Sequence, residues 1–183
     1  MRNRRSIRPV HRDDAAAIAA IYRPIVETTA ISFETVAPTE QEIERRIKAI
    51  TARYPWLVAE EDGKAIGYVY AGSHHERAAY RWSVDTTVYL AEASRGKGLG
   101  KRLCTELLGI LRSLGYVSAY AGVTLPNVGS VALHESLGFT PIGSFRNAGY
   151  KFDRWHDVGY WHLALCAPPK RPDEPRLWPD ASQ

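Results

Sequence analysis

The stretch Ser94–Lys101 (SRGKGLGK) most constrains the fold, because it joins a predicted strand to a predicted helix. Residues 82–90 (WSVDTTVYL) are rich in β-branched and aromatic residues and lack proline, which predicts a strand. After the stretch, leucines recur at helical spacing: Leu99, Leu103, Leu107, Leu111 and Leu114. Glycines let the backbone approach a ligand closely, and a helix N-terminus attracts anions. The stretch is either a candidate cradle for a pyrophosphate or only a turn.

The glycine spacing excludes two better-known phosphate-binding loops. A P-loop places Ser or Thr directly after its Gly-Lys pair, but Lys101 is followed by Arg102. A dinucleotide-binding fold has G-x-G-x-x-G early in a βαβ unit, whereas Arg95-x-x-Gly98-x-Gly100 lies in the middle of this chain. A third kind of loop is therefore expected.

The order of the remaining elements predicts a mixed α/β sheet. Further strands are expected at residues 6–10, 56–60, 64–71, 117–125, 139–144 and 158–165. Helices are expected after Asp13 or Asp14, with Pro24 interrupting or kinking the helix, after Thr39 in a capping box, and after Asn127. This order indicates a central sheet of about seven strands with helices on both faces, and a glycine-rich stretch at a strand's C-terminal end.

Length and composition indicate one domain. The chain has 183 residues, 45% of them hydrophobic, which suffices for a real core. We predict a domain over residues 1–166 that begins with a basic arm at residues 1–5. Five prolines within the last 17 residues predict an extended tail over 167–183.

The charge pattern argues against nucleic acid as a partner. The net charge of +4 equals the four arginines of residues 1–8, so the remainder of the chain sums to zero and no even basic face is expected. We expect the arm to be a solvated tail. No apolar N-terminal segment or run of transmembrane length is found, so we expect no membrane partner and a cytoplasmic location. Cys104 and Cys166 lack metal or disulfide spacing, which predicts two buried thiols.

Several separated motifs carry a resemblance to a known family. They are Arg95-x-x-Gly98-x-Gly100, Asn127-x-x-Ser130-x-x-x-His134, and residues 53–59 (RYPWLVA), 79–85 (AYRWSVD), 133–139 (LHESLGF), 148–151 (AGYK) and 155–159 (WHDVG). Together with the order of elements, they resemble the GNAT superfamily of N-acetyltransferases from about residue 7 to 165. Within that superfamily they resemble the phosphinothricin, methionine sulfoximine and methionine sulfone acetyltransferases.

The resemblance implies transfer of acetyl from acetyl-CoA, without a metal, to the α-amino group of a small amino acid with a tetrahedral, anionic head. It also implies a homodimer, to which the three aromatic residues of the 155–161 segment would contribute an apolar edge. Two alternatives stay open. One is a GNAT enzyme that acetylates protein N-termini or lysines, and the other is a catalytically silent acyl-CoA-binding module.

The resemblance also implies positions for both ligands. The cofactor-binding residues it implies are Val88, Tyr89, Leu90, Arg95, Gly96, Lys97, Gly98, Leu99, Gly100, Lys101, Asn127 and Ser130. The residues it implies for the acceptor pocket are Phe33, His75, Arg77 and Tyr80. Herbicide-detoxifying members tend to carry Lys where this chain has His75, so the identity of the amino acid stays open. Arg81 suits either the pocket or the surface.

The resemblance implies two catalytic residues, Asp85 and His134. An α-ammonium group must lose a proton before it can attack a thioester, and Asp85 aligns with the family's usual glutamate base. Asp85 is one methylene shorter, so its contact would be direct or through water. It could also be only a carboxylate hydrogen-bonded beside a strand bulge. His134 aligns with a proposed catalytic histidine, and its ordinary pKa of ~6.5 suits proton transfer, but it could also be structural. Backbone N–H groups after Asp85 could polarise the thioester carbonyl.

Overall fold

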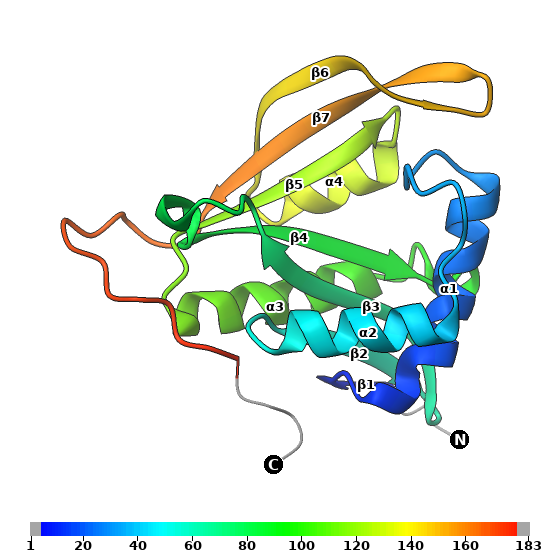
Figure 1. Ribbon diagram of the computed structural model, residues 1–183, viewed down its shortest axis with the longest axis horizontal. Coiled ribbons are helices and arrows are strands. Elements are labelled where there is room, and N and C mark those ends of the chain that lie inside the picture. Colours follow the sequence, from blue (N-terminus) through cyan, green and yellow to red (C-terminus); the bar gives the residue numbers. More distant parts are fainter. Residues whose placement is uncertain (1–4, 179–183) are drawn as a thin grey trace.

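The computed structural model describes residues 5–178 as one seven-stranded sheet with helices on both faces (Figure 1). Its strands are β1 (Arg5–Pro9), β2 (Trp56–Glu61), β3 (Lys64–Ser73), β4 (Ser83–Leu90), β5 (Ser118–Leu125), β6 (Thr140–Lys151) and β7 (Arg154–Ala164). Its α-helices are α1 (Ala15–Thr28), α2 (Glu40–Thr51), α3 (Leu99–Leu114) and α4 (Val128–Ser136). Short 3₁₀ turns are η1 (Arg12–Asp14), η2 (Ala78–Tyr80) and η3 (Glu92–Ser94).

The strand order is β1-β2-β3-β4-β5-β7-β6. Neighbouring strands run antiparallel except β4 and β5, which are parallel because α3 crosses over between them. The predicted mixed α/β sheet of about seven strands is therefore confirmed. The parallel pair lies in the middle of the sheet, so the loop after β4 opens at its C-terminal end, where open α/β sheets bind ligands.

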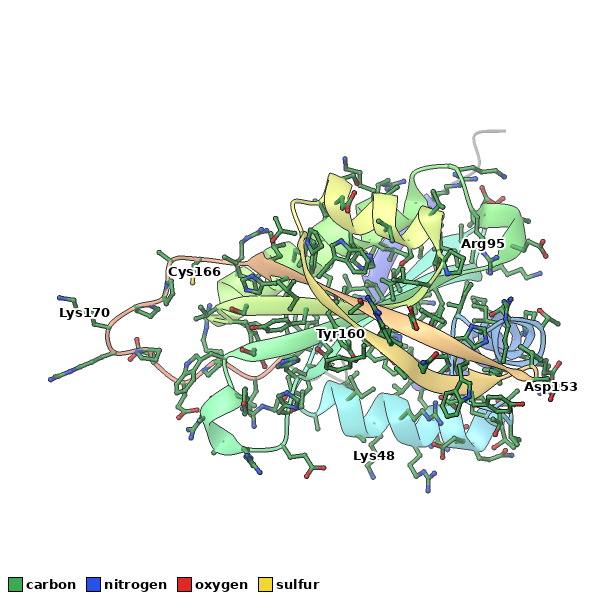
Figure 2. The ribbon with its side chains drawn as sticks, turned by 90° about the horizontal axis from the view of Figure 1, so that it is seen from above. Lys48, Arg95, Asp153, Tyr160, Cys166 and Lys170 are labelled. Carbon is green, nitrogen blue, oxygen red and sulfur yellow. The ribbon has the colours of Figure 1, made fainter. Side chains whose placement is uncertain are left out.

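Two apolar layers cover the sheet. The leucine stripe of α3 packs with Leu57, Val69 and Ala119 on one face. On the other face, α1 and α2 pack against Val58 and Tyr68. Figure 2 shows α2 and α4 on opposite sides of the sheet. Since successive strand residues point to opposite faces, this arrangement decides which strand side chains can meet.

Local structure at α1 and α2 differs in detail from the sequence predictions. Helix α1 starts after Asp14, as predicted, and continues through Pro24. The Asp14 side chain does not cap α1; it accepts the His11 N–H at 2.7 Å and completes a capping box around η1. Thr39 accepts a hydrogen bond from the Glu42 N–H, but the Glu42 carboxylate bonds arginines of α2 instead of completing a capping box.

The last hairpin is longer than the predicted strands at 139–144 and 158–165. Strands β6 and β7 pair as far as Lys151 and Arg154, and the turn places Phe152 and Asp153 at φ +52° and +56°. Two residues with positive φ form the tight turn that matches strand twist. The added length carries the hairpin tip toward α1 (Figure 1).

Both ends of the described chain contact the sheet. Residues 1–4 of the predicted basic arm lie outside the described range, but Arg5 and Arg8 belong to β1 and pair with Glu61 and Glu60, so this part is not a solvated tail.

Cys104 is buried as predicted, whereas Cys166 is exposed because it lies where β7 has ended. Over residues 5–178, no helix is both long and apolar enough to cross a membrane.

The last described residues, 167–178, form neither helix nor strand. Their backbone is nevertheless tied to the sheet's end, because Arg176 N–H donates to the Leu114 carbonyl at 2.8 Å and Trp178 N–H donates to the Arg53 carbonyl at 3.2 Å. The predicted boundary of the domain at residue 166 stays a prediction.

Candidate active site

The two parallel strands separate after a short paired segment. Strand β4 pairs with β5 only over Ser83–Asp85, opposite Ser118–Tyr120, although both strands continue for five more residues. Figure 1 shows β4 and β5 diverging toward their C-terminal ends. Residues 86–90 keep their pairing with β3, but they have no β5 ladder on the other edge. An unpaired strand edge offers backbone donors and acceptors to an extended ligand.

The glycine-rich stretch lies at the mouth of this split. Gly98 is the N-cap of α3 with φ +75°, and no side chain caps the helix, so its first N–H groups are left to a ligand or to water. Gly100 packs closely, since a Cβ there would lie 3.3 Å from the Leu133 side chain. A helix N-terminus with free N–H groups and positive dipole suits a phosphate.

A cavity of about 330 Å³ joins β4, the glycine-rich stretch and α4. Ten of the twelve predicted cofactor-binding residues line it: Val88, Tyr89, Leu90, Arg95, Gly96, Gly98, Gly100, Lys101, Asn127 and Ser130. Lys97 and Leu99 do not, because Lys97 Nζ bonds the Ala93 carbonyl at 2.8 Å and the Leu99 side chain is buried in the core. The sequence prediction missed Ile25, Ile31, Gly129 and Leu133. Figure 2 labels Arg95 beside the N-terminal end of α3.

The start of α4 forms the far wall of the cavity. The Asn127 side chain accepts a hydrogen bond from the Ser130 N–H at 3.1 Å and so caps the helix. His134 Nδ1 lies 2.8 Å from the Ser130 carbonyl, and this histidine is only 4% exposed. Burial lowers the pKa of His134, with the hydrogen bond to Ser130 opposing, so the ring is neutral near pH 7. His134 therefore helps to fix the wall that carries Ser130.

Asp85 lies at the apex of the split, in the last pair that joins β4 to β5. Its Oδ1 lies 2.7 Å from His74 Nδ1, and its side chain is 49% exposed. Burial raises the pKa of the Asp85 carboxyl above its ordinary value, and the hydrogen bond with His74 opposes this rise. The site thus places a carboxylate of raised basicity where the unpaired strand edges begin.

Asp85 and His134 lie on opposite faces of the sheet. The side chain of Thr86, the residue after Asp85, faces a small void that it shares with Cys104 and His134, and this void admits no water. Adjacent strand residues alternate, so Asp85 faces the other way, beside His74 and Tyr120. The structure therefore does not bring the two predicted catalytic residues together.

Of the four predicted acceptor residues, His75 and Tyr80 gather beside His74, the partner of Asp85, whereas Arg77 is exposed and Phe33 lies at the last hairpin. The His75 ring lies 4.3 Å from His74 and 4.7 Å from Tyr80, measured between ring centroids. Arg77 precedes η2 with an exposed side chain and forms no ion pair with any described residue. Phe33 lies against the last hairpin, since its ring would be 2.3 Å from a Cβ on Gly149.

The Arg81 guanidinium pairs with Glu174 of the C-terminal segment. Of the two positions that the sequence left open for Arg81, this ion pair favours the surface over the pocket.

The sequence analysis missed His74. The register of β3 with β4 brings His74 to Asp85, because it sets Gly72 directly opposite Asp85. A residue two positions after Gly72 can therefore reach Asp85, but only a known register reveals it. The ring of His74 also stacks on Tyr120, with 4.0 Å between centroids and 11° between planes.

The side chains that fasten the loop of residues 29–37, which carries Phe33, were also not predicted from the sequence. Lys151 is 7% exposed, and its Nζ donates to the carbonyls of Val26 and Ser32, each at 2.7 Å. Within the loop, Glu34 accepts two hydrogen bonds from Arg46, at 2.7 and 3.1 Å. The hairpin β6–β7 and helix α2 thus hold the loop from two sides.

Residues 5–178 contain no group of three or more His, Cys, Asp or Glu side chains arranged to hold a metal ion. A split between two parallel strands, with an uncapped glycine-rich helix start at its mouth, fits an acyl-CoA, whose extended arm can pair with a strand edge and whose pyrophosphate suits a helix start; this site defines an acyl-CoA-dependent transferase. Comparison with known proteins gives the family. Residues 7–159 match the acetyltransferase (GNAT) domain, and the chain belongs to the GNAT family.

Several relatives extend over nearly the whole chain. Phosphinothricin N-acetyltransferase of Streptomyces viridochromogenes is 44% identical over 166 residues, which cover 90% of this chain and 91% of that protein. The L-methionine sulfoximine/L-methionine sulfone acetyltransferase of Salmonella typhimurium is 34% identical over 161 residues, 87% of this chain and 94% of that one.

A solved structure agrees with the fold. The crystal structure of a GNAT superfamily phosphinothricin acetyltransferase from Sinorhizobium meliloti, in complex with acetyl-CoA, superposes with a TM-score of 0.90 at 35% identity, covering 97% of each chain. The chain is accordingly an acetyl-CoA-dependent N-acetyltransferase that resembles the phosphinothricin and methionine sulfoximine enzymes.

Proposed function

We propose that this enzyme acetylates the α-amino group of a small amino acid of the phosphinothricin or methionine sulfoximine type. The observation that carries the proposal is the split between β4 and β5, with Asp85 at its apex and the glycine-rich stretch at its mouth. The activities in the names of the relatives support the same substrate class.

The residues of the split fit acetyl-CoA, which supplies an acetyl thioester when bound. The unpaired backbone of Val88, Tyr89 and Leu90 would bond the amides of the pantetheine arm as an added strand does. N–H groups of residues 95–101 would hold the pyrophosphate, with the Arg95 and Lys101 side chains beside it. Asn127 and Ser130 would contact the arm from the far wall.

Asp85 would supply the carboxylate of the general base that removes a proton from the α-ammonium group. Its raised pKa brings the carboxyl closer to neutrality, which strengthens it as a proton or hydrogen-bond acceptor. Backbone N–H groups after Asp85 would stabilise negative charge on the carbonyl oxygen. His134 enters this proposal as the residue that holds Ser130 in place, because its ring lies on the other face of the sheet.

The acceptor would lie on the face of Asp85, between the loop that follows β3 and the loop that carries Phe33. The guanidinium of Arg77 matches a carboxylate or phosphinate in a bidentate fork. His75 and Tyr80, whose rings are in contact, would line the same pocket. Phe33 would close it from the side of the last hairpin.

We also propose a homodimer that forms through the β6–β7 hairpin. Ile142, Phe145, Tyr150 and Trp155 are each more than half exposed on this hairpin, which is a large apolar surface for a monomer. Trp161, which the sequence analysis counted toward this edge, is buried and does not contribute. We expect sedimentation to give twice the 20.5 kDa mass of the chain, and Trp155→Glu to give the monomer.

For the dimer, Leu177→Glu is a matched control, since Leu177 is equally exposed but belongs to the C-terminal segment. A wild-type chain that sediments only as a 20.5 kDa species at micromolar concentration contradicts the dimer.

The substrate proposal is tested by measuring CoA release with a panel of amines. The panel contains phosphinothricin, methionine sulfoximine, methionine sulfone, a peptide with a free N-terminus and a lysine peptide with a blocked one. We expect turnover only with the free amino acids. Turnover with a peptide alone favours the protein-acetylating alternative. Binding of acetyl-CoA without turnover of any amine favours the catalytically silent one.

A further inference from the structure

His74 is the side chain most closely tied to the proposed base. Its Nδ1 lies 2.7 Å from Asp85 Oδ1, a distance typical of a charge-assisted hydrogen bond. Its ring is fixed by stacking on Tyr120, at 4.0 Å and 11°. Only 19% of the His74 side chain is exposed. Two independent contacts therefore hold this ring in one orientation.

The hydrogen bond determines which ring nitrogen is free. An ionised carboxylate has acceptors only, so the proton of a neutral imidazole must be on Nδ1 for this bond to form. Nε2 then has a lone pair, and among residues 5–178 no hydrogen bond involves it. A lone pair on a fixed, partly buried imidazole can accept a proton.

The groups around His74 are few. From its own loop, His75 lies 4.3 Å away and Tyr80 6.1 Å away between ring centroids, and Arg77 is exposed. From β4 comes Asp85, and from β5 comes Tyr120, which His162 of β7 contacts at 5.0 Å. Among the described residues, no lysine or arginine forms an ion pair with Asp85, so His74 is the partner that this carboxylate holds.

We propose that His74 and Asp85 form one proton-accepting dyad, in which His74 Nε2 takes the proton of the acceptor's ammonium group and Asp85 holds the ring. The inference rests on the proposed function and names a further catalytic residue for it. A carboxylate that fixes the tautomer of an imidazole and stabilises the imidazolium is a known way to make a strong base at neutral pH. The dyad also extends the reach of a carboxylate that is one methylene shorter than glutamate.

Each proton and electron pair of the acetyl transfer has a donor and an acceptor. An ammonium N–H bond breaks, its electron pair stays on nitrogen, and the proton binds His74 Nε2. The nitrogen then forms a bond to the acetyl carbonyl carbon as the carbon–sulfur bond breaks, and the leaving sulfur takes the bonding pair. His74 returns its proton to that sulfur, and the second proton lost by the nitrogen passes to water.

Two measurements test the dyad. The first is the pH dependence of turnover in His74→Gln, which keeps a side-chain donor for Asp85 but cannot accept a proton. We expect kcat to fall by roughly 10²–10⁴-fold, the range of a general base, with acetyl-CoA affinity unchanged. The loss should shrink as pH rises, because a free amine needs no base. His162→Gln, on the other side of Tyr120, is the matched control and should keep wild-type turnover.

The second measurement reads the tautomer directly in the wild-type protein without substrate. Nitrogen-15 NMR should show the His74 proton on Nδ1, and Asp85→Asn should remove this preference. A proton on Nε2, or a His74→Gln enzyme with wild-type kcat across the pH range, overturns the dyad. A wild-type enzyme that releases no CoA with any amine contradicts the proposed function instead, and the NMR result still reports on the dyad.

Discussion

Replacing Lys151 by methionine should weaken the attachment of the loop of residues 29–37. Methionine fills a similar volume, so the main loss is the ammonium group and its two hydrogen bonds to the carbonyls of Val26 and Ser32. Each bond from a charged donor contributes about 1.5–3 kcal/mol net. Part of this is offset, because burial lowers the pKa of Lys151, which means that the charged form is costly to bury.

We therefore expect Lys151→Met to lower the free energy of unfolding by about 2–3 kcal/mol, after the desolvation offset. For a domain of this size, about 2–4 °C of melting temperature corresponds to each kcal/mol, so the transition should shift down by roughly 4–12 °C. Thermal unfolding followed by circular dichroism measures the shift. Hydrogen exchange should show faster exchange over residues 29–34 than in the wild type.

Lys48→Met is the control for this prediction, because Lys48 is an exposed lysine on α2 and its replacement should stay within about 0.5 kcal/mol. A Lys151→Met protein that melts with the wild type and exchanges the loop amides at the wild-type rate refutes the reasoning. That result would mean that Glu34 and Arg46 hold the loop without the hairpin.

Three further predictions concern the site. Gly98→Asp should abolish acetyl-CoA binding, measured by calorimetry, because it places a negative charge at the helix start. Gly98→Asn is the control: asparagine tolerates the positive φ and has no charge, so this variant should bind acetyl-CoA more tightly than the aspartate variant. Asp85→Asn should keep acetyl-CoA affinity and lose roughly 10²–10⁴-fold in kcat, less at high pH, while Asp85→Glu should stay active. Protonation of Asp85 removes the acceptor for the His74 Nδ1 proton, so activity should be lost as pH drops through the raised pKa of Asp85, and an Asp85→Asn profile unchanged from that of the wild type contradicts this role. Gly149→Ala should push the Phe33 ring aside and raise KM for the amine. Gly109→Ala is the control, because a Cβ at Gly109 in α3 meets no atom within 4 Å.

The parts of the fold that the sequence predicted are those encoded locally. The leucine stripe of α3 depends on residues close together in the chain and is found where expected. The strands predicted at residues 56–60 and 64–71 are likewise found, as β2 and β3, joined by a short turn at Asp62 and Gly63. The glycine-rich stretch also has a local signature, because few residue types adopt the positive φ that Gly96 and Gly98 require.

The parts that the sequence did not predict depend on tertiary pairing. His74 meets Asp85 only through the register of β3 with β4, and His134 is separated from Asp85 by the alternation of strand faces. The long last hairpin was underestimated because residues 145–149, where the register shifts, lack a regular strand pattern. Lys151 gave no signal, since a lysine is rarely buried and its partners are main-chain carbonyls of a distant segment.

The contacts of Lys151 also have a consequence for the order in which the protein is made. They join residue 151 to residues 26 and 32, which precede it by 125 and 119 positions in the chain. During synthesis the N-terminal loop emerges long before the hairpin that fastens it. Contacts between residues so far apart in the chain form late. The glycine-rich stretch is therefore already synthesised while the loop that carries Phe33 is still unattached. The last strands to leave the ribosome thus complete the loop formed by some of the earliest residues.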